Sequence, residues 1–416
     1  MKKRICFIFI LFLCLLSSSV FAASTNSLSI NSDACILVED STGYILFEKN
    51  SKEKMYPAST TKILTALLVL EKGNLIDTVT ISNTAVSSLS GGYVTPYISA
   101  GEELTVEQLL NVLLIPSGNV AGNALAEYVS GSIDNFCVLM NSRAKELGCV
   151  NSHFTNPYGL HNENHYSCAY DLYLIAKEAM KYDVFRSIVS KTSYTLAPSN
   201  KHLRDDRTLY STNDLIKPNS SSYYEYALGI KTGYTSQAKD CLVSAATKDN
   251  MTLYAVILGA GKSDTGTSYR YNDIKKLFNY GFNNYLFRTL RSKDSVVQTV
   301  EVAGATSDTK NLDLILDSTI TAFINSNDAY TSFIPTVTLN ELSAPITKGS
   351  IVGSISYNVN GKIYTANLLA GNDVQKSYLF VFVDIGMLIT VLILIKLIVS
   401  KNKKRKKKSS YWFLKI

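Results

Sequence analysis

The chain has 416 residues, of which 46% are hydrophobic and 18% charged, with 41 basic and 34 acidic side chains. Its formal net charge of +7 is concentrated at the ends, since twelve basic residues and one acidic residue lie within 1–23 and 377–416. The sequence between these ends is near −4, so neither composition nor charge favours nucleic-acid binding, and the length allows two or three domains.

Residues 1–23 predict a secretory signal peptide. A basic start at residues 2–4 precedes an apolar run, and the small residues Ala22 and Ala23 close it. This order of charge, apolar core and small-residue cleavage site is typical of an export signal that is removed. We therefore expect the chain that follows to leave the cytoplasm.

The main domain is predicted at residues 24–287, with strands at both ends and helices between them. Residues 26–56 alternate apolar and polar side chains around a Ser-Thr-Gly turn at 41–43, which indicates a hairpin. Helical periodicity dominates residues 61–181. Strands return with "ALGIKTGYT", "CLVSAATKD" and "MTLYAVILGAG", and "YRYNDIKKLFNYGFNNY" indicates a closing helix. This order predicts an α+β fold in which helices back an antiparallel sheet.

A small all-β domain is predicted at residues 288–372. This part is rich in Val, Thr and Ser and has few helical periods. The Asn360-Gly361 pair lies between two apolar runs, which is a strong hairpin signal.

Residues 377–400 are predicted to form one transmembrane helix. Asp384 and Lys396 are its only charges, and about 20 apolar residues span a bilayer. The tail at 401–416 begins with "KNKKRKKK", and such basic runs stay cytoplasmic, which places the preceding domains outside. A core helix beside a solvated basic tail is the alternative, but a core helix does not require a run of basic residues directly after it.

The cysteines outside the signal peptide form neither a CxxC pair nor a dense disulfide framework. We expect them to be small buried apolar residues, with a single disulfide as the alternative. They are Cys35, Cys137, Cys149, Cys168 and Cys241.

Ser59 and Lys62 form an SxxK pair at the start of a predicted helix, so their side chains share one face. A serine hydroxyl is a weak nucleophile until a base takes its proton. Lysine can be that base when burial or nearby positive charge lowers its pKa. Alone, the pair is weak evidence, because Ser59 also fits a helix N-cap.

Two further triads strengthen the interpretation. Ser117-Gly118-Asn119 follows a predicted helix, and Lys231-Thr232-Gly233 lies on a predicted strand. The order SxxK, SxN, KTG resembles that of serine penicillin-binding proteins and β-lactamases.

Three longer segments narrow the resemblance: "MNSRAKELGCVNSHFTNPYGLHNENHYSCAYDL", "YSTNDLI" and "GIKTGYTSQAKDCLVSAA". They are similar to the D-alanyl-D-alanine carboxypeptidases of the low-molecular-weight penicillin-binding protein family (serine peptidase family S11), over about Ser29 to Tyr285. The β-rich part and the C-terminal membrane segment fit the same family. Val120, where Asp is frequent, and Cys168, where Thr is common, depart from its pattern.

Chemistry and the resemblance together imply the catalytic roles. Ser59 would attack the penultimate D-alanine carbonyl with Lys62 as general base. Ser117 would pass the proton to the leaving D-alanine nitrogen. Asn119 would hold the substrate amide and position Lys62.

The third triad is implied in substrate binding. Lys231 and Thr232 would recognise the terminal carboxylate, and Gly233 would let substrate approach the strand closely. Backbone N–H groups of Ser59 and Tyr234 would form the oxyanion hole. We expect peptidoglycan pentapeptide as substrate, β-lactams as covalent inhibitors, and a site on the extracellular face of a membrane of the Gram-positive type.

We expect neither a metal nor another cofactor, because His153, His161 and His165 form no HExxH pattern. A β-lactamase-like hydrolase is one rival function. Glu163 is followed four residues later by Ser167 instead of the asparagine of the class A pattern. The other rival is a non-catalytic, membrane-tethered peptidoglycan-binding protein, which would not need nucleophile and base together.

Overall fold

The computed structural model describes residues 28–89, 98–204 and 206–412. By its internal contacts the chain divides between Asn283 and Asn284 into two units, each described here by itself. The predicted boundary at 287 lies inside strand β10 (Tyr285–Arg291) of the second unit. The predicted signal peptide lies outside the described residues.

The first unit is built on a five-stranded antiparallel sheet with the order β2-β1-β9-β8-β7. Its N-terminal hairpin therefore pairs with the last strand of the unit, with Cys35 opposite Ile257. The predicted hairpin and the three predicted adjacent strands are confirmed. The strands are β1 (Ala34–Glu39), β2 (Ile45–Lys49), β7 (Ala227–Thr235), β8 (Lys239–Lys248) and β9 (Met251–Ala260).

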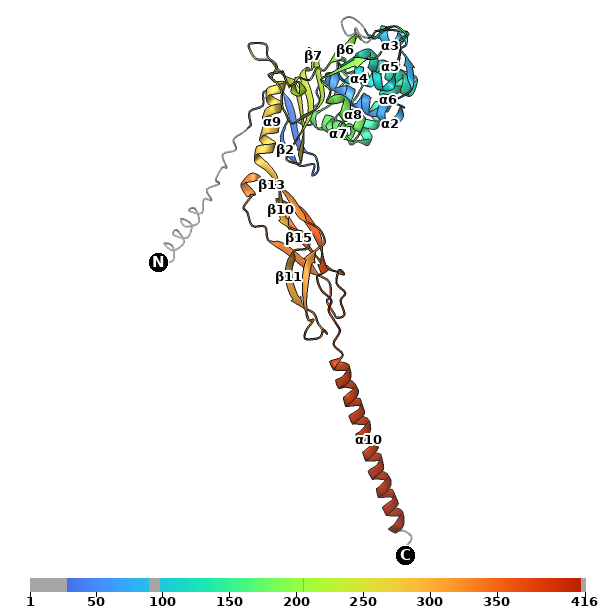
Figure 1. Cartoon of the computed structure of the whole chain (residues 1–416), viewed down its shortest axis with the longest axis vertical. Helices are drawn as coiled ribbons and strands as arrows, with labels where there is room; N and C mark the ends of the chain where they lie inside the picture. The colour runs from blue at the N-terminus through green and yellow to red at the C-terminus, as the bar shows by residue number, and fades with distance from the viewer. Residues whose placement is uncertain (1–27, 90–97, 205, 413–416) are drawn as a thin grey trace, which may run out of the picture. The chain divides into compact units, whose positions relative to one another are not determined.

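Helices cover both faces of this sheet (Figure 1). Most of them form one large apolar core with one face of the sheet, while the closing helix α9 lies on the other face, where its Gly281 meets Leu37 and Leu253. The helices of the larger layer are α2 (Lys62–Lys72), α3 (Asn83–Ser87), α4 (Val106–Leu114), α5 (Asn119–Ser130), α6 (Ile133–Glu146), α7 (Ala169–Ala179) and α8 (Asp183–Val189), and α9 spans Arg270–Asn284.

Local signals fix several of these helix ends. Thr105 and Gln108 form a capping box at the start of α4, and Ser132 caps α6 through the N–H of Asn135. Helix α5 ends at Gly131, whose φ of 76° is the left-handed conformation that favours glycine. The shorter elements are β3 (Thr78–Thr80), β4 (Glu103–Thr105), β5 (Ser193–Leu196), β6 (Arg207–Tyr210) and the 3₁₀ turns η1 (Ala58–Thr61) and η3 (Asp214–Ile216).

The second unit contains a β-rich domain, as the sequence predicts. One five-stranded sheet has the order β11-β12-β16-β15-β14, and β10 pairs with β13. Asn360 and Gly361 form the turn between β15 and β16, both with positive φ, and Val359 pairs with Lys362 across it. The further elements are β11 (Val296–Glu301), β12 (Asn311–Leu316), β13 (Ile320–Asn325), η4 (Ser326–Asp328), β14 (Pro335–Leu339), β15 (Ile351–Val359) and β16 (Lys362–Ala370).

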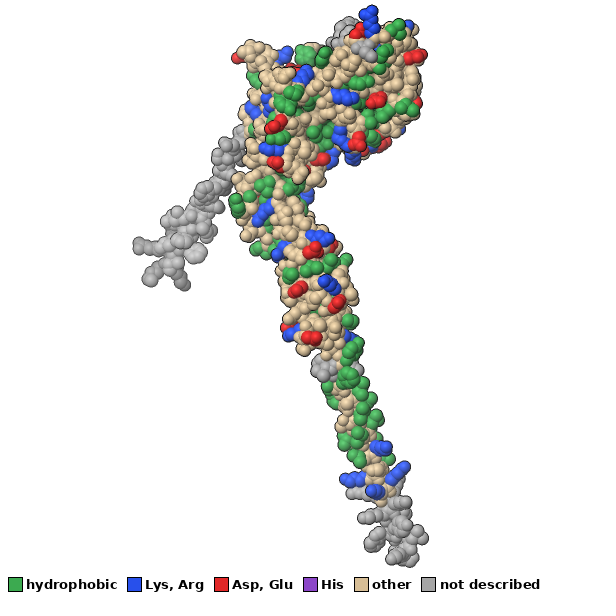
Figure 2. Space-filling view, in the orientation of Figure 1, with side chains coloured by type: hydrophobic (Ala, Val, Ile, Leu, Met, Phe, Trp, Pro, Cys, Tyr) green, Lys and Arg blue, Asp and Glu red, His purple; other side chains and the backbone are tan. Residues whose placement is uncertain are grey.

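Helix α10 (Leu379–Trp412) follows the β-rich domain. Its stretch Phe382–Lys404 is long and apolar enough to cross a membrane, with a mean hydropathy of 2.6, and is not buried within the protein. Figure 2 shows apolar side chains along this helix, followed by Lys side chains. The helix begins two residues after the predicted span and continues into the basic run.

The five cysteines outside the signal peptide are free thiols. Four are buried, and Cys137 is partly exposed. Cys168 also serves as the N-cap of α7, because its Sγ accepts the N–H of Asp171 at 3.4 Å. A thiol thus occupies the position that a hydroxyl usually takes in a cap.

Candidate active site

Ser59 lies in the 3₁₀ turn η1, which leads directly into α2. Neither element has a side-chain cap, and Ser59 is the N-cap of neither, so the N-cap alternative is wrong. Sequence reasoning placed Ser59 on the first turn of an α-helix. In a 3₁₀ turn, side chains three residues apart eclipse each other, which brings Ser59 over Lys62.

The backbone before Ser59 is strained and tightly enclosed. Ala58 has a φ of +48°, a left-handed conformation that costs a non-glycine residue roughly 1–2 kcal/mol. A Cβ on Gly159 would lie 1.8 Å from the Ala58 carbonyl oxygen, and one on Gly233 would lie 2.9 Å from the Ser59 nitrogen. Two glycines therefore allow two neighbouring backbone segments to pack closely against the turn, which is how such strain persists.

Lys62 is fully buried and makes three hydrogen bonds through Nζ. Its partners are Ser59 Oγ at 2.9 Å, Asn119 Oδ1 at 2.7 Å and the Tyr158 carbonyl at 2.8 Å. Burial, and then the positive charge of Lys231, hold the pKa of Lys62 well below its usual range. A neutral amine held this way can donate to Asn119 and Tyr158 while it accepts the Ser59 proton.

The second triad forms a tight connection between α4 and α5. Ser117 has a φ of +68°, Gly118 is the N-cap of α5, and Asn119 is its first residue. The Gly118 N–H donates to the carbonyl of Val112 at 2.9 Å. This turn directs Asn119 to Lys62 and keeps Ser117, which is partly exposed, at the helix start.

The third triad lies on β7, which packs against η1. Lys231 is 1% exposed, and its Nζ donates to the carbonyl of Thr232 at 2.9 Å. Burial, and then the charge of Arg270, lower the pKa of Lys231 to about 7. Tyr234 is 57% exposed. Lys231 therefore holds its positive charge less firmly than an exposed lysine does.

Three contributors were missed from sequence. The Tyr158 group that contacts Lys62 is a backbone carbonyl, so no residue type could reveal it. Thr212 places Oγ1 2.6 Å from Thr232 Oγ1, and Arg270 bonds Asp240 at 2.7 Å while its charge acts on Lys231. Thr212 lies in a segment that was noted only for its family likeness, and Arg270 lies in one that was interpreted only as a closing helix.

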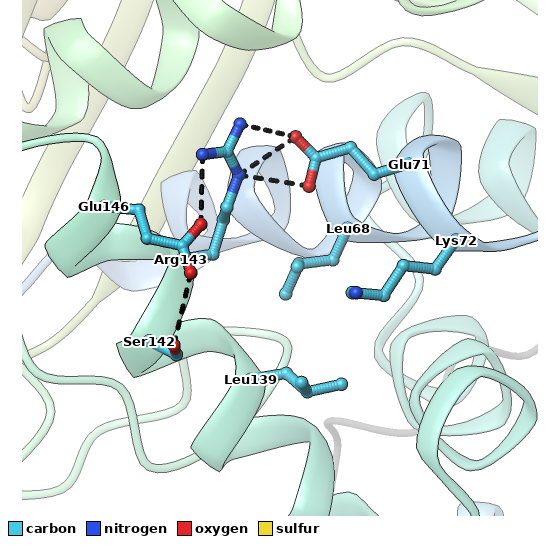
Figure 3. Close-up of a pocket in the computed structure, with 7 residues that line it drawn as sticks. All are labelled: Leu68, Glu71, Lys72, Leu139, Ser142, Arg143 and Glu146. Atoms are coloured by element: carbon cyan, nitrogen blue, oxygen red, sulfur yellow. Dashed lines mark hydrogen bonds and ion pairs between the residues drawn. The ribbon is translucent and has the colours of Figure 1, made fainter.

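A separate pocket lies at the far end of α2 from Ser59, between α2 and α6 (Figure 3). Its volume is about 230 Å³. Arg143 crosses it from α6 to pair with Glu71 of α2 at 2.7 Å, and also pairs with Glu146 and Glu178. None of the predicted site residues lines this pocket. Its ion pairs brace the two helices, and we assign it no part in the chemistry.

Comparison with known proteins identifies the family. Residues 20–262 match the family model described as D-alanyl-D-alanine carboxypeptidase, and residues 285–376 match that of the penicillin-binding protein 5 C-terminal domain. The chain is 34% identical over 367 residues to the D-alanyl-D-alanine carboxypeptidase DacF of Bacillus subtilis, which covers 86% of this chain and 89% of that protein. The chain belongs to the D-alanyl-D-alanine carboxypeptidase family.

Other relatives and solved structures of this carboxypeptidase family agree. DacC of Escherichia coli is 33% identical over 368 residues, covering 84% of this chain and 86% of that protein. Penicillin binding protein 5 from Haemophilus influenzae has a TM-score of 0.61 at 27% identity, over 84% of this chain and 98% of that one. A peptidoglycan synthesis regulatory factor from Streptococcus pneumoniae has a TM-score of 0.66 at 25% identity, over 83% and 100%.

The family resemblance, the serine carboxypeptidase class and the α+β fold with a β-rich second domain are thereby confirmed. Among residues 28–89, 98–204 and 206–412, the structure groups no three His, Cys, Asp or Glu side chains as metal ligands. His165 uses both ring nitrogens within the protein, toward Thr61 and Thr155.

Proposed function

We propose that this carboxypeptidase releases the terminal D-alanine of peptidoglycan stem peptides through an acyl-enzyme on Ser59. The observation that carries the proposal is the 2.9 Å contact between Lys62 Nζ and Ser59 Oγ, in a site that is buried enough to lower the pKa of Lys62. A base of this kind, within hydrogen-bond reach of the hydroxyl, is what an activated serine requires.

Acylation then proceeds by one bond made and one broken. Ser59 Oγ bonds to the carbonyl carbon of the penultimate D-alanine while its proton moves to Lys62 Nζ. The N–H groups of Ser59 and Tyr234 stabilise the oxyanion. The C–N bond breaks as Ser117 relays the Lys62 proton to the leaving D-alanine nitrogen. Water then hydrolyses the ester and restores the Ser59 hydroxyl.

Lys231 and Thr232 are proposed to bind the terminal carboxylate of the peptide. Lys231 has a pKa of about 7 because burial opposes its charge. An incoming carboxylate favours the charged form, so binding would stabilise the protonated form of Lys231. The Thr232 hydroxyl can donate its proton to the same carboxylate while its oxygen accepts a hydrogen bond from Thr212 Oγ1, which lies 2.6 Å away.

The cellular setting is proposed from the two ends of the chain. An export signal at 1–23 and a single helix that ends in a basic run support a domain tethered to the outer face of the cell membrane. This setting fits peptidoglycan as substrate, β-lactams as covalent inhibitors, and an envelope of the Gram-positive type.

Incubation of the purified protein with benzylpenicillin, followed by mass spectrometry and peptide mapping, tests the proposal. We expect a stable ester on Ser59, and no adduct on the Ser59→Ala variant. A rapidly released ester would favour the β-lactamase-like alternative. Folded protein without any adduct would favour the tethered binding protein, and an adduct on another residue would overturn the assignment of Ser59.

A further inference from the structure

His165 is the one buried residue in an otherwise solvent-facing stretch. Residues 162–164 are exposed, whereas His165 is only 1% exposed. A buried polar ring must find partners for both nitrogens, and those that His165 finds lead to the catalytic turn.

The protonation state of the ring follows from its contacts. The backbone N–H of Thr155 points to His165 Nδ1 at 3.0 Å, and a backbone N–H can only donate. Nδ1 must therefore carry no proton, and the proton of the neutral ring resides on Nε2. Nε2 lies 2.8 Å from the hydroxyl oxygen of Thr61, to which it donates.

Thr61 connects this ring to the catalytic pair. It is the last residue of η1, directly precedes Lys62, and is the N-cap of α2, yet its hydroxyl caps no backbone N–H. A threonine at this position usually stabilises its own helix. Here the hydroxyl instead contacts His165, so it links η1 to the loop that carries His165 and does not cap α2.

The same loop holds the start of α2 at two further points. The Tyr158 carbonyl accepts from Lys62 Nζ, and the Pro157 carbonyl accepts from Thr65 Oγ1 at 2.6 Å. Gly159 lies so close that a Cβ there would approach the Thr61 hydroxyl oxygen to 2.9 Å. The loop from Thr155 to His165 therefore contacts both the turn and the first residues of α2.

We propose that His165 is a positioning residue for Ser59 and Lys62, which its neutral ring holds in place through the hydroxyl of Thr61. The inference rests on the proposed roles of Ser59 and Lys62. Its physical basis is that η1 is strained at Ala58 and has no side-chain cap, so outside contacts must fix its geometry. A protonated ring could no longer accept from Thr155 and would place a second cation beside Lys62.

Full-length protein in detergent, acylated by a fluorescent penicillin, tests this role with one matched pair of variants. Thr61→Val removes the hydroxyl that His165 holds. Thr65→Val removes an equally buried bond between α2 and the same loop, one helical turn further on. We expect Thr61→Val to lower the acylation rate constant about 10-fold or more, because small misplacements of reacting groups are costly. Thr65→Val should stay within about threefold, since it lowers stability similarly but leaves the turn in place.

Two substitutions of His165 complete the test. His165→Gln keeps an acceptor for Thr155 and a donor for Thr61 and should restore most of the rate, whereas His165→Leu should behave like Thr61→Val. The acylation rate constant of the double variant His165→Leu/Thr61→Val should be no lower than that of either single variant, because both substitutions remove the same hydrogen bond. The acid limb of the pH–rate profile, which reports on Lys62, should move in His165→Leu and stay in His165→Gln.

Several results would overturn the inference. If Thr61→Val and Thr65→Val lowered the acylation rate constant equally, the loop would only support the fold in general. If the losses of the two single variants multiplied in the double variant, His165 and Thr61 would act independently. If His165→Leu fails to fold, the Thr61→Val and Thr65→Val pair still decides. A wild-type protein that is not acylated at all would overturn the proposed function itself. A wild type that is acylated, with His165 and Thr61 variants that react at the same rate, would overturn only the role of His165.

Discussion

Acid should destabilise the folded protein through His165, and Gln at this position should remove that sensitivity. Burial, with smaller contributions from the neighbouring His153, His161 and Lys62 side chains, lowers the pKa of His165 from 6.5 to about 3 in the folded chain. Between these two values the unfolded chain binds more protons than the folded chain, so stability falls as the pH falls. The loss at pH 5, relative to pH 7.5, is about 2 kcal/mol.

Thermal unfolding at a series of pH values, with wild-type and His165→Gln protein, measures this loss. For a domain of this size, about 2 kcal/mol corresponds to roughly 4–8 °C in Tm. Carboxylates elsewhere also titrate below pH 5, but they do so in both proteins. Between pH 7.5 and pH 5, we therefore expect the Tm of the wild type to fall by about 4–8 °C more than that of His165→Gln. The relevant unfolding transition is the one whose Tm shifts when benzylpenicillin is bound. Parallel declines in the two proteins would refute a neutral, buried His165.

Three further predictions concern the catalytic residues and the topology. Lys62→Arg should abolish acylation, with a rate lower by roughly 10²–10⁴-fold or more, because arginine stays charged. Lys231→Arg should still release part of the D-alanine from a diacetyl-Lys-D-Ala-D-Ala peptide. The reverse pattern would exchange the roles of the two lysines. Gly233→Ala should slow acylation by at least about 10-fold, since its Cβ would come within 2.9 Å of the Ser59 nitrogen; an unchanged rate would mean that the turn is free to move. Protease outside intact protoplasts should release the catalytic unit ahead of residues 377–400, and digestion of the tail alone would reverse the orientation.

The parts of the site that sequence predicts are those carried by short windows. Ser59 and Lys62 are three residues apart, and any tight right-handed turn brings such residues together. The same holds for the Asn360-Gly361 hairpin, whose two positive φ values follow from the residue types. The strand that carries Lys231 was likewise predicted from one segment, "ALGIKTGYT".

The parts that sequence could not predict depend on contacts between distant segments. The pairing of β1 with β9 joins residues more than 200 positions apart, and no local pattern encodes a partner at that distance. Tyr158 contributes a carbonyl, and the choice of segment that supplies it depends on packing. From sequence, His165 was considered only as a metal ligand and rejected as one, because its burial beside Thr61 exists only in the folded chain.

The charges of the site form a series in which each group lowers the pKa of the next. The charge of Arg270 acts on Lys231, and that of Lys231 acts on Lys62. Two buried lysines coupled in this way titrate as a pair, so their protons redistribute together. In the mechanism proposed above, a bound carboxylate would stabilise the proton on Lys231. Lys62 is fully buried, and its Nζ contacts Ser59, Asn119 and the Tyr158 carbonyl, so it would be left neutral beside the Ser59 hydroxyl. If Lys231 binds the substrate carboxylate as proposed, substrate binding itself would favour the protonation state that acylation needs, and the surroundings of the two lysines would give them opposite roles.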